Sequence, residues 1–235
     1  MRNEKKIQEI YRNHEDDEKI CEPADFCCDG RTLLHAGITT LPNGVFLHFP
    51  KAHGMEEAPE LVDSETIFEG RVFRVRIDHI RYDDDAVHRI DVIEHRGSFG
   101  IIALPAANEI VLVRQYRHPI ARSLWEIPAG TAELGEEPTL GAARELQEET
   151  GYRAGRIRAI GSLFMTPGFC NEIMHFFVAE DLTAGEQSLD DDERIEVASF
   201  TLDEAEALTK TGQIADAKTL IALLWMRGAR GQITA

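Results

Sequence analysis

The sequence lacks any apolar run long enough to cross a bilayer, and the nearest approach, residues 220–226, is much shorter than a span requires. The positive charges in residues 1–6 are followed by no apolar segment and no small-residue cleavage site, so the pattern of a secretory signal is missing. We therefore expect a cytoplasmic protein with no membrane partner.

Positive charge is also scarce, because 25 Lys and Arg residues stand against 42 Asp and Glu residues, which gives a formal net charge of −17. Such an excess of negative charge repels nucleic acids and anionic lipids at long range, so we expect no nucleic-acid partner. We interpret the acidic runs at 15–18, 83–85 and 190–193 as solvated loops.

Cysteine is the third scarce feature, with 4 residues in the chain and no C-x-x-C pair among them. Reduced thiols are the expectation. A zinc site built from Cys21, Cys27, Cys28 and His35 is an alternative, because thiolate and imidazole are zinc ligands, although the spacing is atypical.

The first part of the chain, residues 1–63, is polar and then rich in Pro and Gly, with no sustained period. We expect an irregular N-terminal extension of unknown role, with at most a short helix near 7–11 and a short strand at 45–49. From residue 64 to residue 96 the pattern changes to alternation at 73–79 and 87–94, separated by an acidic turn. This pattern predicts an antiparallel hairpin region.

The remaining residues, 97–235, are expected to form the main domain. Two helices are predicted, one over 137–149 with Pro138 in its first turn and one over 217–226 with Asp216 as N-cap. Together with the strands, they indicate an α/β fold in which helices pack on a mixed sheet. The predicted strands cover 99–104, 110–116, 157–164, 174–178 and 197–201.

The first predicted helix carries a concentration of carboxylates. Glu145, Glu148 and Glu149 lie three or four residues apart and therefore share one helix face, while Glu136 comes just before the helix. Arg144 is the only adjacent cation. Hard oxygen ligands of this kind favour Mg²⁺, with Mn²⁺ as a possible substitute.

The spacing around these carboxylates is specific: Gly130, five residues, Glu136, seven residues, then RELQEETGY over 144–152. It resembles the Nudix box at every defined position. In physical terms, Gly130 permits a tight backbone at the loop entrance, Leu146 anchors the helix, and Gly151 permits the exit turn.

The Nudix resemblance implies an α/β/α sandwich whose loop–helix–loop holds the metal. It implies Glu145 and Glu149 as direct ligands, with Glu148 next. Arg144 is then expected to orient a carboxylate through an ion pair, and Glu136 is the candidate. The complete expected set of metal ligands is Ala129 through its carbonyl, Glu136, Glu145, Glu148 and Glu149.

Outside the box, residues 165–172 resemble the proline–glycine loop of the ADP-ribose pyrophosphatase branch, with Pro167 fifteen residues beyond Tyr152. Residues 113–119 and 125–130 resemble the same branch. The resemblance implies hydrolysis of ADP-ribose to AMP and ribose 5-phosphate. It implies Glu172 as the residue that activates water, with Gly168 allowing the loop to close and Glu148 as the rival base.

Two arginines are candidates for contact with the substrate phosphates, because a guanidinium can bind phosphate oxygens through two donors. Arg117 matches an arginine of the branch's substrate site, and Arg96 shows a weaker similarity.

Relatives in the ADP-ribose pyrophosphatase branch also exchange an N-terminal hairpin between subunits. The resemblance therefore implies a homodimer formed through residues 67–94.

The sequence leaves alternative functions open. The substrate could be a different nucleoside diphosphate derivative, such as GDP-mannose, ADP-glucose or a dinucleoside polyphosphate. A domain that binds nucleotide sugars without hydrolysing them is a further alternative. It usually lacks box carboxylates, and here every one of them is present.

Overall fold

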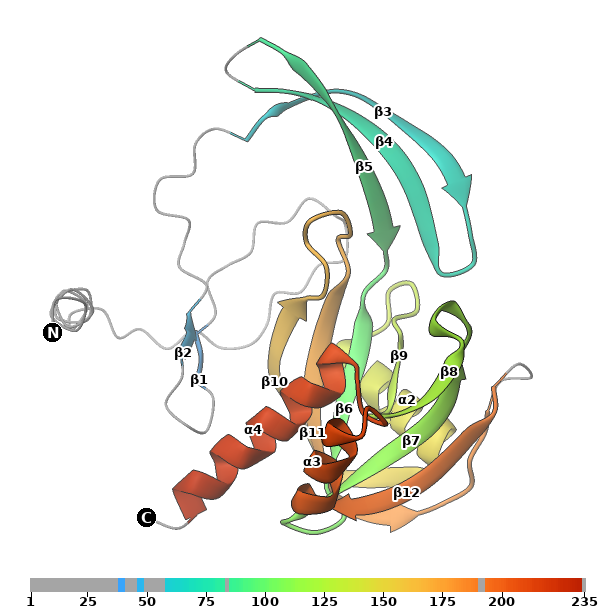
Figure 1. Ribbon diagram of the computed structural model, residues 1–235, viewed down its shortest axis with the longest axis vertical. Helices are drawn as coiled ribbons and strands as arrows, with labels where there is room; N and C mark the ends of the chain where they lie inside the picture. The colour runs from blue at the N-terminus through green and yellow to red at the C-terminus, as the bar shows by residue number, and fades with distance from the viewer. Residues whose placement is uncertain (1–37, 41–45, 49–57, 83–84, 190–192, 234–235) are drawn as a thin grey trace, which may run out of the picture. The chain divides into compact units, whose positions relative to one another are not determined.

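The computed structural model describes residues 38–40, 46–48, 58–82, 85–189 and 193–233 (Figure 1). The chain divides into two compact units, 1–37 and 38–235, and all the described residues belong to the second. The expected helix near 7–11 and the alternative zinc site lie outside the described residues. The expected strand at 45–49 is present as β2 (Phe46–His48), which pairs antiparallel with β1 (Ile38–Thr40).

The expected hairpin is present as β4 (Phe73–Arg81) and β5 (Val87–His95). A third strand, β3 (Glu60–Glu69), pairs antiparallel with β4 and completes a three-stranded sheet. It crosses the boundary that the sequence indicated at residue 63. Strand β3 was not predicted as a separate strand, because all ten of its residues are exposed and no alternation of buried and exposed positions marks it.

Two further sheets form the centre of the main domain. The four-stranded sheet has the order β10-β11-β6-β9, and it is mixed because β11 and β6 run parallel. The three-stranded sheet has the order β12-β7-β8 and is antiparallel. The strands are β6 (Ser98–Ala103), β7 (Glu109–Arg117), β8 (Arg122–Glu126), β9 (Ala129–Thr131), β10 (Tyr152–Phe164), β11 (Ile173–Ala184) and β12 (Ile195–Thr201).

Alternating side chains of these strands enter two separate hydrophobic cores. Phe99, Ile101 and Phe177 pack under α2 (Pro138–Thr150) together with its Leu146. The second core lies under α3 (Leu202–Lys210) and α4 (Ala217–Ile233), and it contains Ile102, Ile110, Leu112, Trp125, Phe176 and Met226. Figure 1 shows α3 and α4 in front of the sheets and α2 behind them. The expected α/β/α sandwich with a mixed sheet is therefore confirmed.

The helices agree in part with the sequence-based prediction. Helix α2 begins and ends within one residue of the expected range, and α4 continues beyond residue 226. Helix α3 was not predicted, although Thr201 and Glu204 form a complete capping box that marks its start. Within the described ranges, no helix is long and apolar enough to span a membrane.

Candidate active site

The geometry of the site begins with the way α2 is fixed at both ends. The Glu137 side chain accepts a hydrogen bond from Leu140 N at 2.9 Å and caps the first turn. At the other end, Gly151 takes a left-handed conformation with φ of 75°, as the expected exit turn requires. Buried Leu146 holds the helix on the sheet. The carboxylates of α2 therefore project from a helix that is held at both ends and along one face.

Arg144 binds three carboxylates at once, one before α2 and two on it. Its Nε and Nη2 donate to the two oxygens of Glu136 at 2.8 and 3.0 Å. Its Nη1 donates to Glu148 Oε2 at 2.7 Å and lies 3.0 Å from Glu145 Oε1. The ion pair expected between Arg144 and Glu136 is thus present, and the same guanidinium holds the acidic face together.

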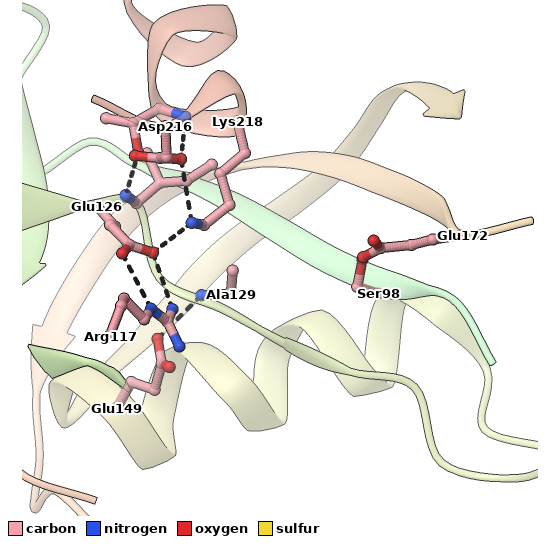
Figure 2. Close-up of polar contacts among 10 residues, drawn as sticks. Ser98, Arg117, Glu126, Ala129, Glu149, Glu172, Asp216 and Lys218 are labelled. Atoms are coloured by element: carbon pink, nitrogen blue, oxygen red, sulfur yellow. Dashed lines mark hydrogen bonds and ion pairs between the residues drawn. The ribbon is translucent and has the colours of Figure 1, made fainter. Parts of the chain in front are cut away.

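Glu149 is the most deeply buried carboxylate of the helix, with 4% of its surface exposed. Its Oε2 accepts a hydrogen bond from Ala129 N at 2.9 Å (Figure 2). Burial raises the pKa of Glu149 to about 8, and the charges of Glu145 and Glu193 add to this effect. Burial also raises the pKa of Glu145 to about 7, although Arg144 opposes the rise. Near neutral pH and without a cation, Glu149 is therefore mainly protonated and Glu145 is protonated in part.

Gly130 has a different role from the one the sequence suggested. Its φ is not positive, so backbone freedom does not explain it. A Cβ at this position would lie 1.9 Å from Glu145 Cδ and 2.1 Å from both carboxylate oxygens. The residue is glycine because Glu145 packs directly against its backbone.

The residues of this site fit a hard divalent cation by their chemistry. The donors are carboxylates and backbone oxygens, which suit Mg²⁺ or Mn²⁺. Burial raises the pKa values of Glu145 and Glu149, so both carboxylates pay a penalty for their charge that a bound cation would offset. As they stand, no three His, Cys, Asp or Glu side chains of the described residues converge into a ready metal cluster. Arg144 occupies the carboxylates of Glu136, Glu145 and Glu148 instead.

Glu172 lies in a separate part of the site. Its Oε1 accepts a hydrogen bond from Ser98 Oγ at 2.7 Å, and Figure 2 shows this pair apart from Glu149 and its partners. The loop that carries it is attached to β5, since Ile93 N donates to Phe169 O at 2.7 Å and Asn171 N donates to Ile93 O at 3.1 Å. A Cβ at Gly168 would meet no atom within 4 Å, so space does not require glycine there.

The two candidate phosphate-binding arginines have different surroundings. Arg117 donates from Nε and Nη2 to the two oxygens of Glu126, at 3.0 and 2.8 Å. Arg96 Nη2 donates to Arg71 O at 3.0 Å, and its side chain borders an open pocket of about 410 Å³. The same pocket is lined by Asn171, which precedes Glu172. Arg96 thus lies near the loop, and Arg117 lies near Glu149.

Two features of the site were missed from the sequence. Glu193 was interpreted as part of a solvated acidic loop, but its charge adds to the effect of burial in raising the pKa of both Glu145 and Glu149. Nothing in its spacing connects it to the box, 44 residues earlier. The second feature is the buried carboxylate of Glu126, which binds Arg117 and Lys218. An acidic residue inside the apolar run 124–127 was a usable signal.

Comparisons with known proteins agree with this architecture. A family model described as NUDIX domain matches residues 94–223. A methanol dehydrogenase activator from Bacillus methanolicus is 39% identical over 71% of this chain and 91% of its own length. An ADP-ribose pyrophosphatase from Bacillus subtilis is 36% identical with the same coverage. A crystal structure of an ADP compounds hydrolase superposes with a TM-score of 0.67 at 22% identity, covering 77% of this chain and 98% of that one.

The close packing of Glu145 on Gly130 leads to a test. In Gly130→Ala the new methyl group displaces the Glu145 carboxylate, so we expect the affinity for Mn²⁺ to fall about 10- to 100-fold. Titration followed by electron paramagnetic resonance measures this affinity, and circular dichroism checks that the fold is kept. Unchanged Mn²⁺ affinity in a folded variant would show that Glu145 is not a ligand.

Proposed function

The chain belongs to the NUDIX family, and on that footing we propose that it hydrolyses the pyrophosphate bond of a nucleoside diphosphate sugar in a Mg²⁺-dependent reaction. ADP-ribose is the proposed preferred substrate, with AMP and ribose 5-phosphate as the products. One observation carries the proposal. Arg144 gathers Glu136, Glu145 and Glu148, and Glu149 is held beside them by Ala129 N.

The residues that would hold the cation are Glu145 and Glu149, with Glu148, Glu136 and the Ala129 carbonyl as further donors. When bound, Mg²⁺ offsets the charge of the two phosphates and makes a water molecule more acidic. Mn²⁺ is the expected substitute. The role of Arg144 is to keep the acidic face in one arrangement, because its three contacts fix Glu136, Glu145 and Glu148 relative to one another.

Water attack also needs a general base, and three carboxylates compete for that role. Glu148 is bonded to Arg144, and Glu172 accepts a hydrogen bond from Ser98. Glu193 acts electrostatically on both Glu145 and Glu149 and lies outside the set of proposed ligands. We take Glu193 as the stronger candidate for the general base. Glu172 is supported by the resemblance of the 165–172 loop to the ADP-ribose pyrophosphatase branch.

The substrate-binding part of the proposal rests on Arg117 and Arg96 for the phosphates and on Pro167 and Gly168 for the shape of the adjoining loop. ADP-ribose is favoured because the relative from B. subtilis, which matches 91% of its own length, is named for that substrate. The alternatives are GDP-mannose, ADP-glucose or a dinucleoside polyphosphate. Binding without hydrolysis is disfavoured by the complete set of carboxylates.

We also propose a homodimer formed through the β3–β4–β5 sheet. This sheet exposes large apolar side chains that the described part of the chain leaves uncovered, and a second copy would remove them from water. The aromatic pair Phe68 and Phe73, with ring centroids 6.0 Å apart, lies at the end of the sheet where β3 connects to β4. The other exposed apolar residues of the sheet are Leu61, Val62, Ile67 and Val87.

The proposed reaction is tested by a panel of nucleotide sugars and dinucleoside polyphosphates at fixed Mg²⁺, with product analysis by chromatography. We expect ADP-ribose to give the highest kcat/KM. Glu149→Gln should lose at least roughly 100-fold in kcat, because loss of a metal ligand costs several kcal/mol of transition-state stabilisation. Glu137→Gln, the same change at the cap of the same helix, is the control. Full activity of Glu149→Gln would refute the metal-dependent reaction.

The choice of base is tested by two matched variants. Glu193→Gln should lower kcat by roughly 100-fold or more with little change in KM, because a general base contributes about 10²- to 10⁴-fold. Glu172→Gln should lose less than about tenfold on the same scale. The reverse order would return the role to Glu172.

The dimer is tested by light scattering at micromolar concentration. We expect a mass of two chains for the native protein and a shift toward one chain for Phe68→Asp, because a charge on the apolar face opposes its burial. Leu224→Asp places the same charge at an exposed position of α4 and serves as the control. A native mass of one chain would contradict the proposal.

A further inference from the structure

A buried cluster of charges connects the first turn of α4 with the end of β8. Glu126 is its centre, with 2% of its surface exposed. Arg117 binds this carboxylate through two hydrogen bonds, and Lys218 Nζ binds the same carboxylate from the side of α4 (Figure 2). Lys218 also donates to Asp216 Oδ1 at 3.0 Å. The cluster therefore contains two carboxylates and two cations. Glu126 binds both cations, and Asp216 binds Lys218 as well.

The two cations of the cluster together keep Glu126 ionised although it is buried. Burial would raise the pKa of Glu126, but hydrogen bonds from Arg117 and the charge of Lys218 outweigh it and place the pKa below its usual value. Lys218 divides its charge between Glu126 and Asp216. Lys218 and Arg117 both form ion pairs with Glu126. The negative charge of Glu126 is therefore neutralised by two cations and not by the Arg117 guanidinium alone.

Lys218 is held in place by backbone attachments on both sides of it. Asp216 Oδ1 accepts from Thr219 N at 3.0 Å and caps α4. The buried hydroxyl of Thr219 accepts from Ile127 N at 2.9 Å, and Trp125 N donates to Gln213 O at 2.8 Å. The first turn of α4 is thus fixed on residues 125–127, and the position of Lys218 relative to Glu126 follows from the backbone.

Arg117 connects this cluster with the candidate active site. Its side chain is 38% exposed, so the guanidinium reaches the surface while its partner Glu126 is buried. Figure 2 shows the guanidinium between Glu126 and Glu149. The charge of Glu149 acts on Arg117 and is among the causes that raise its pKa, after the hydrogen bond to Glu126.

We propose that Lys218 is a positioning residue that acts through Glu126 on Arg117, and that it leaves part of the Arg117 charge available to a substrate phosphate. This inference rests on the proposed function. Without Lys218, Arg117 becomes the only cation against a buried carboxylate and is drawn further into that ion pair. Its field toward a phosphate then weakens, whereas the carboxylates of α2 are unchanged.

The test is steady-state hydrolysis of ADP-ribose by the full chain in Mg²⁺. Lys218→Met should raise KM about tenfold with kcat within about twofold, because it removes binding that is uniform along the reaction. Lys218→Arg, which keeps the charge, should return KM to within about threefold of the native value. Lys210→Met, at the exposed end of α3, is the matched control and should change neither constant.

A second variant distinguishes the electrostatic role of Lys218 from a role in holding the first turn of α4. Asp216→Asn keeps a capping side chain but frees Lys218 to give its whole charge to Glu126, so KM should fall. A role limited to stabilising the turn would make Lys218→Met and Asp216→Asn raise KM together. That outcome, or a Lys218→Met variant with native KM, would overturn the inference.

The outcome for Lys218 can be separated from the outcome for the proposed function. If the native chain hydrolyses no member of the substrate panel, the proposed function fails, and calorimetric titration with ADP in Mg²⁺ takes its place for Lys218. A weaker affinity in Lys218→Met and a stronger affinity in Asp216→Asn would still support the inference. Equal affinities, or no binding of ADP by the native chain, would overturn it.

Discussion

The packing of two glutamates of α2 against the backbone of β9 is the constraint around which the site is built. Glu149 is buried and accepts a hydrogen bond from Ala129 N, while Glu145 occupies the space that a side chain at residue 130 would fill. Two carboxylates are thereby held close together in a place where burial penalises their charge. A divalent cation relieves that penalty, which is why an arrangement costly in its absence is suited to binding a metal.

The helices on the two faces of the sandwich both contribute residues to this site. Helix α2 packs on one core and contributes the carboxylates, whereas α4 packs on the other and contributes Lys218 and Thr219. The two sides meet at residues 125–130, where Glu126 binds Lys218 and Ala129 binds Glu149. The short segment from Glu126 to Ala129 therefore contacts both α4 and the acidic helix.

Sequence reasoning found the parts of the molecule whose signals are local. Helix α2, its exit turn at Gly151 and its acidic face follow from spacing within 23 residues, 130–152. Strand β3 gave no signal because its exposed residues show no alternation, and the steric reason for Gly130 needed the position of Glu145. Glu193 and Lys218 join the site only through the fold, since they are distant from the box along the chain.

The raised pKa values of Glu145 and Glu149 fit a pocket made for a divalent cation. Calorimetry of Mn²⁺ binding in buffers of different ionisation enthalpy measures the protons released on binding. We expect the release of about one proton per chain at pH 7, because the metal requires both carboxylates ionised, and almost none at pH 9. Binding without proton release at pH 7, or no binding at either pH, would contradict the account.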